Sequence, residues 1–237
     1  MRRLEASDLL ALWERGAPRH ALDRSALLCA WARPDVPADA VADLPLGTVT
    51  AALLRLRTET FGARIRAHVD CERCGERLEL NLAAGELLQP VDDDAVAPRE
   101  IEVGGLRVRA PSLRDLAAVS RERDAEHAAR LILERCMRHD GRADVVLPEA
   151  GLRQVEDALE AIDPNADLAF DVRCAVCGHE GCAQLDAGEL LWDEIDARAR
   201  ALLGEVHLLA RAYGWTEGEV LGLSGARRAA YLAMVAA

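Results

Sequence analysis

Two matching cysteine motifs constrain the fold of this 237-residue chain more than any other feature. The first spans residues 71–75 (CERCG) and the second spans residues 174–178 (CAVCG). Two cysteines three positions apart suit a tight turn whose backbone N–H groups point at the sulfurs, and the glycine that follows tolerates the positive φ of such a turn. Each motif supplies half of a tetrahedral thiolate site. We therefore expect one structural Zn²⁺ to be bound by Cys71, Cys74, Cys174 and Cys177.

The segments that flank the motifs favour a zinc-ribbon-like element over a redox site. Strand-like runs precede both motifs, at residues 65–70 and 168–173. After the first motif, leucines alternate with polar residues over 78–82, and residues 183–186 form a weaker candidate strand after the second. A thioredoxin-type pair would instead open a helix in a βαβ unit. The gap between the pairs exceeds the roughly 15–20 residues common for zinc, so a redox pair and unpaired structural thiols are the alternatives.

Three further cysteines and one histidine need separate interpretations. Cys29 and Cys136 lie in apolar helical patterns, which is typical of buried small hydrophobic residues. Cys182 and His179 closely follow the second motif. Cys182 is an alternative metal ligand, and His179 is expected to be a surface residue, with a hydrogen-bond donor to the site or a ligand as its alternatives. The odd total of seven cysteines, four of them in metal-type spacing, favours the reducing cytoplasm.

Composition excludes several classes of function. All 29 basic residues are arginine, which excludes a phosphate-loop lysine and a Schiff-base lysine. The net charge is −12, and residues 1–70 are close to neutral, with 10 arginines against 9 acidic residues. The acidic remainder makes nucleic acid an unexpected partner. No apolar run approaches the length of a membrane span and the first residues do not resemble a signal peptide, so we expect no membrane association.

The pattern of apolar residues predicts an α+β fold that is mainly α-helical. Alanine and leucine dominate the hydrophobic 51% of the chain, and aromatic residues make up only 3%. We expect a helical N-terminal unit (1–62), a zinc-ribbon-like β element with a long α/β insertion between its motifs (63–188), and a long helix with a short helical tail (189–237). Within the insertion, Gly104-Gly105 predicts a hairpin turn, and the acidic block at residues 92–94 predicts a solvated loop.

The C-terminal third predicts helices that dock on protein. Apolar residues recur at helical spacing from residue 191 to 213, Gly214 ends the helix, and Thr216 with Glu219 forms a capping box. The alternative is a helix-turn-helix motif that binds DNA, but two arginines on an acidic background make a poor recognition helix. Protein binding or docking within the chain is therefore favoured.

No catalytic constellation is found in the sequence. Glu205 and His207 are two positions apart on a predicted helix and so do not face each other. Ser-His-Asp patterns, HExxH and glycine-rich nucleotide loops are missing from the sequence. We expect neither an enzyme nor a small-molecule substrate.

Several stretches share the motifs of one protein family. The most specific are residues 191–195 (LWDEI), 205–217 (EVHLLARAYGWTE), 221–224 (LGLS) and 227–232 (RRAAYL). Residues 45–47 (PLG), 53–57 (LLRLR), 61–62 (FG), 109–112 (RAPS), 115–116 (DL) and both cysteine motifs add to the likeness. Together they resemble the baseplate proteins of T-even-like contractile phage tails and related extracellular contractile injection systems, which are described as baseplate hub assembly chaperones. Residues 180–182 (EGC) depart from the family, where an aromatic residue is expected.

The resemblance implies a non-enzymatic protein that binds hub, spike or wedge components while the device is assembled. We expect the tail to present the binding surface, because aromatic and arginine side chains supply most interface energy. The anchor candidates are Tyr213, Trp215, Arg227, Arg228 and Tyr231. The alternative for Trp215 and Tyr231 is that they only hold the tail helices together. Two other functions stay open: a zinc-ribbon accessory factor for nucleic acid or a polymerase complex, and a zinc enzyme with an open coordination position.

Overall fold

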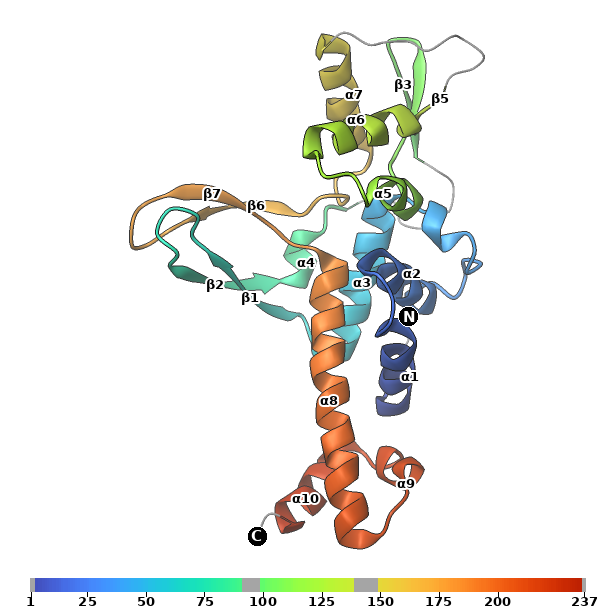
Figure 1. Cartoon of the computed structure of the whole chain (residues 1–237), viewed down its shortest axis with the longest axis vertical. Helices are drawn as coiled ribbons and strands as arrows, with labels where there is room; N and C mark the ends of the chain where they lie inside the picture. The colour runs from blue at the N-terminus through green and yellow to red at the C-terminus, as the bar shows by residue number, and fades with distance from the viewer. Residues whose placement is uncertain (1–2, 91–98, 139–148, 236–237) are drawn as a thin grey trace.

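The computed structural model describes residues 3–90, 99–138 and 149–235 and shows an elongated, mainly helical molecule. A helical body lies at the centre, and three parts project from it (Figure 1). A pair of β-hairpins forms an arm, a small α/β insertion lies at one end of the long axis, and a long helix leads to a helical tail at the other end. The predicted mainly helical α+β class is confirmed.

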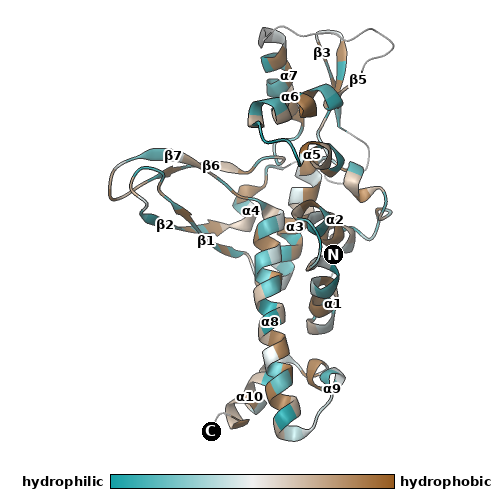
Figure 2. Ribbon diagram, in the orientation of Figure 1, coloured by the Kyte–Doolittle hydropathy of each residue, from teal (hydrophilic) through white to brown (hydrophobic). Residues whose placement is uncertain are grey.

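The body is built from three N-terminal helices and the first half of a long C-terminal helix. Its elements are α1 (Ala6–Gly16), α2 (Ala21–Ala32), the 3₁₀ turn η1 (Val41–Asp43), α3 (Leu46–Phe61) and α8 (Ala187–Tyr213). Leu28, Leu56, Leu191 and Ile195 are fully buried where α2, α3 and α8 meet. Hydrophobic and hydrophilic residues alternate along α8 (Figure 2), as expected for a helix with one buried face. The main core therefore joins helices from the first and last of the predicted segments.

α8 approaches α2 closely at Gly188. A Cβ atom at this position would lie 2.2 Å from the Ser25 hydroxyl oxygen, so only glycine fits without a shift. Near the base of the arm, the buried Arg57 of α3 makes a two-pronged ion pair with Glu194 of α8, with N–O distances of 3.0 and 2.7 Å. Arg57 also donates to the carbonyl of Gly62, where the chain leaves the body for the arm. These contacts fix α8 against the body.

The arm consists of two antiparallel hairpins. β1 (Arg64–Asp70) pairs with β2 (Arg77–Ala83), and β6 (Ala169–Arg173) pairs with β7 (Glu180–Gln184). In the first hairpin the apolar residues of the two strands are directly opposite one another, as in Ala67↔Leu80, and so share one face. β7 begins three residues earlier than the expected strand at 183–186, because pairing with β6 extends up to the cysteine motif and overrides the weak local preference of Gly181.

The insertion has a small core of its own. The chain first forms α4 (Ala84–Leu87), which packs on α3 of the body. The insertion then comprises β3 (Glu100–Val103), β4 (Leu106–Arg109), α5 (Leu113–Val119), α6 (Ala125–Cys136), β5 (Met137–Arg138) and α7 (Glu149–Ile162). The strands form a sheet of order β3-β4-β5, and Val108, Cys136 and Val155 are buried beneath it. The hairpin predicted at Gly104-Gly105 is confirmed, since both glycines have positive φ between β3 and β4. The acidic block at residues 92–94 lies outside the described residues.

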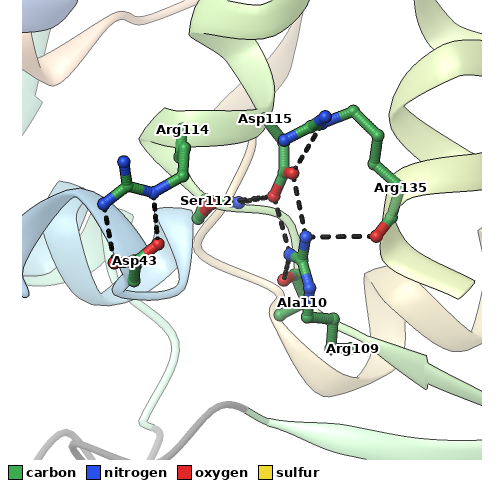
Figure 3. Close-up of polar contacts among 7 residues, drawn as sticks. All are labelled: Asp43, Arg109, Ala110, Ser112, Arg114, Asp115 and Arg135. Carbon is green, nitrogen blue, oxygen red and sulfur yellow. Dashed lines mark hydrogen bonds and ion pairs between the residues drawn. The ribbon is translucent and has the colours of Figure 1, made fainter. Parts of the chain in front are cut away.

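A buried carboxylate joins β4 and α6 to α5 (Figure 3), and α5 in turn packs on α2 and η1 of the body. Asp115 of α5 accepts two hydrogen bonds from Arg109 of β4 at 2.6 and 2.9 Å, and one from Arg135 of α6 at 2.9 Å. It also caps its own helix by accepting from the backbone N–H and hydroxyl of Ser112. Burial alone would raise the pKa of Asp115, but hydrogen bonds from Arg109 and Ser112 hold it well below the usual range.

The tail comprises the second half of α8 with two short helices, α9 (Glu217–Leu221) and α10 (Gly225–Val235). The predicted end of α8 is confirmed, since Gly214 adopts the left-handed conformation and its N–H bonds the carbonyl of Ala210. The predicted capping box of Thr216 and Glu219 opens α9. Leu209 and Val220 are fully buried, so the tail has a small apolar centre.

Candidate functional site

Each hairpin of the arm ends in a cysteine motif of the same geometry. In the first, the N–H of Cys71 donates to Glu76 O at 2.8 Å and the N–H of Gly75 donates to Cys71 O at 2.8 Å. In the second, Cys174 donates to His179 O and Gly178 donates to Cys174 O, both at 2.9 Å. The two glycines have φ of +72° and +70°. The motifs are thus equivalent turns, and positive φ explains the glycine in each.

The two turns bring four sulfurs into one cluster. The Sγ atoms of Cys71, Cys74, Cys174 and Cys177 all lie within 4.8 Å of one another. The Cys71–Cys177 and Cys74–Cys174 sulfur distances are 3.7 and 3.6 Å. A tetrahedral zinc with Zn–S bonds of about 2.3 Å holds its sulfurs roughly 3.8 Å apart. The donor set and its spacing therefore fit a closed metal site.

Backbone N–H groups prepare the sulfurs to carry negative charge. The N–H groups of Cys177 and Val176 lower the pKa of the Cys174 thiol to about 7. The N–H of Glu76 acts in the same direction on Cys74, but the neighbouring thiols, Cys177 first among them, raise the pKa of Cys74 to about 12. Each thiolate that forms therefore makes it harder to deprotonate the next thiol, and a divalent cation would remove this repulsion between negative charges.

The other cysteines are placed apart from this cluster. Cys29 and Cys136 are buried as predicted, and burial raises their pKa values to about 12 and about 11. Cys182 is exposed and lies opposite Asp171 on the outer face of its hairpin. Among the residues that the structure describes, the ligand group contains neither Cys182 nor His179.

The tail gathers three aromatic side chains at its turn. Tyr213 stacks on Trp215 with ring centroids 4.7 Å apart, and Tyr231 of α10 meets both rings edge-on at 5.7 and 4.9 Å. Tyr213 is exposed, whereas Trp215 and Tyr231 are half-buried. The aromatic cluster, defined as Tyr213, Trp215 and Tyr231, therefore fastens α10 to α8 and also reaches the surface.

The two arginines among the anchor candidates differ in their exposure. Arg227 is exposed. Arg228 is only 5% exposed, pairs with Glu205 of α8 at 2.8 Å, and donates to the carbonyl of Leu223. Arg198 binds the other oxygen of Glu205 at 2.7 Å. Arg228 thus holds the tail together, and Glu205 is engaged by two arginines rather than by His207.

The ion pairs made by Asp115, Glu194 and Glu205 were not predicted from the sequence. Their partners are separated by 6 to 137 residues in the chain, as for Arg109–Asp115 and Arg57–Glu194. No local motif signals such pairs.

No protein-family model, curated protein or solved structure matches this chain. Within residues 3–90, 99–138 and 149–235, every helix is too short or too polar to cross a membrane.

Proposed function

We propose that this protein is a non-enzymatic assembly factor or component of the baseplate of a contractile phage tail or contractile injection system. It would act in the cytoplasm of the producing bacterium by binding hub, spike or wedge proteins. The family motifs support this role, and the most specific of them fall in the tail at residues 205–217 and 227–232.

The exposed apolar surface of the tail is the observation on which the proposal rests. Of the six large hydrophobic residues that are exposed in the described chain, five belong to the tail: Leu203, Leu208, Tyr213, Met234 and Val235. Both tyrosines of the chain also lie there, in contact with Trp215. Aromatic and arginine side chains are enriched among the residues that anchor interfaces. The aromatic cluster and Arg227 are the proposed anchors.

We propose further that the four-cysteine centre holds a structural Zn²⁺. Four thiolates fill a tetrahedral shell, which leaves no position for a substrate. The residues fit this ion because their sulfur distances of 3.6 and 3.7 Å match a tetrahedral zinc. The metal would join the tips of two hairpins that belong to separate two-stranded sheets.

The proposed role is tested by affinity purification of the full-length tagged protein from cells that produce the device. Recovery in complete sheathed particles would identify a baseplate component, and recovery with unassembled hub, spike or wedge proteins would identify a chaperone. If nucleic acid or a polymerase is recovered instead, the baseplate role is wrong.

Two variants locate the binding surface. Replacing Tyr213 and Trp215 together by alanine should abolish recovery of the partner while circular dichroism shows the helices retained. The matched control is Val176→Ser at the tip of the arm. Val176 is the one exposed large hydrophobic residue outside the tail in the part of the chain that the structure describes, and its replacement should leave recovery unchanged. Equal capture by both variants would contradict binding through the tail.

A further inference from the structure

α10 presents an uncovered apolar face to solvent. Ala226, Ala230, Ala233 and Met234 are all exposed on this 11-residue helix, and Met234 is 66% exposed. Arg228 turns inward to Glu205, so Arg227 is the only charged side chain on the outer surface of α10. Small side chains beside Met234 would let a second helix approach closely.

The tail is neutral in a strongly acidic chain. Residues 203–235 contain three arginines and three acidic residues, whereas the whole chain has a net charge of −12. All of the net negative charge therefore lies outside this segment. Two copies that meet through their tails would avoid the repulsion that other faces would create.

The shape of the molecule reinforces this effect. The tail occupies one end of the long axis, and α8 separates it from the body, the arm and the insertion (Figure 1). Charges further apart than the Debye length, about 8 Å at physiological salt, are largely screened. Tail-to-tail contact would thus keep the acidic parts of two copies apart.

We infer that the uncovered face of α10 binds a second copy of this chain, giving a symmetric dimer joined through the tails. In a two-fold arrangement the same patch serves both copies, so each α10 packs on its counterpart near Ala230 and Met234. The inference is independent of the proposed baseplate role, because the purified protein alone tests it.

The test is sedimentation equilibrium of the full-length, metal-loaded protein over a wide range of concentration. We expect a mass of twice 25.7 kDa at high concentration. Ala230→Glu or Met234→Glu places two like charges across the two-fold axis and should weaken the dimer at least about tenfold. The control is Ala129→Glu on the exposed surface of α6, which makes the same charge change and should leave the dimer unchanged.

Salt gives a second readout. Because the contact is apolar and the acidic parts of the two copies lie more than a Debye length apart, raising the salt concentration above the physiological level should not dissociate the dimer. A monomer at every concentration would overturn the inference. So would dissociation by salt, or equal effects of Ala230→Glu and Ala129→Glu while circular dichroism shows both variants folded.

Discussion

Replacing Asp115 by asparagine should destabilise the insertion by loosening β4 and α6 from α5. The wild-type carboxylate is fully buried and accepts from Arg109, Arg135 and Ser112 at once (Figure 3). Asparagine has the same shape, but its amide nitrogen would replace one carboxylate oxygen and face the groups that now donate hydrogen bonds to that oxygen. The change removes the charge that balances Arg109 without creating a cavity.

The expected cost follows from the burial of the partners. Breaking a buried ion pair by removing one member costs about 3–5 kcal/mol. The side chains of Arg109 and Arg135 are 23% and 40% exposed, so both can recover some hydration. We therefore expect the free energy of unfolding of the insertion to fall by the lower end of this range, about 3 kcal/mol. With a urea m-value of about 2 kcal/mol/M, the midpoint for the insertion should fall by about 1.5 M.

The position of the tryptophans provides the assay. Trp13, Trp31, Trp192 and Trp215 all lie outside the insertion, so their fluorescence reports on the body and tail. Far-UV circular dichroism also detects α5, α6 and α7. In Asp115→Asn, part of the circular dichroism signal should be lost at lower urea than the fluorescence change.

Asp43→Asn is the matched control. Asp43 also makes a two-pronged pair, with Arg114, at 2.6 and 2.8 Å, but both side chains are more than half exposed. Exposed pairs contribute at most about 1 kcal/mol. If Asp43→Asn destabilises the protein as much as Asp115→Asn, burial does not set the strength of the network and the reasoning fails.

Three other changes test separate parts of the structure. The pKa of the Asp115 carboxyl in the folded protein lies below its unfolded value of about 4. The ionised carboxyl therefore stabilises the fold fully above that pH, and this contribution is lost as the pH falls further. Acid unfolding monitored by circular dichroism should show a weaker pH dependence in Asp115→Asn. Cobalt bound at the four-cysteine centre should give the absorption of a tetrathiolate complex at one metal per chain. Cys174→Ser should abolish this absorption, and Cys182→Ser should not. Loss of the absorption in both variants would contradict the ligand set. Gly188→Ala should destabilise the body by about 1–3 kcal/mol, and adding Ser25→Ala should restore part of the thermal midpoint. No recovery would mean that a clash with the Ser25 hydroxyl is not the cause.

The features that the sequence predicted well have local signals. The CxxCG turns, the capping box of Thr216 and Glu219, and the glycine end of α8 each depend on residues within a few positions. Such motifs satisfy nearby backbone groups, so they need little help from tertiary structure. The coming together of the two cysteine pairs was predictable only because metal chemistry requires four ligands.

The rest of the site depends on contacts between distant residues. The predicted apolar stripe of α8 lies in two different environments. Leu191 and Ile195 are buried in the body, whereas Tyr213 is 40% exposed on the tail. Arg228 looked like a surface anchor, but it lies 5% exposed against Glu205 because α10 folds back on α8. Helical spacing shows which residues share a face, but not what covers that face.

α8 also sets how the two ends of the molecule are related. It is unbroken from Ala187 to Tyr213, so its 27 residues span about 40 Å. Its first turns are embedded in the body and its last turns hold α9 and α10. Inserting one residue between these parts would rotate the tail by about 100° and advance it by about 1.5 Å. The length of this single helix therefore fixes both the distance and the orientation, relative to the body, of a partner bound at the tail.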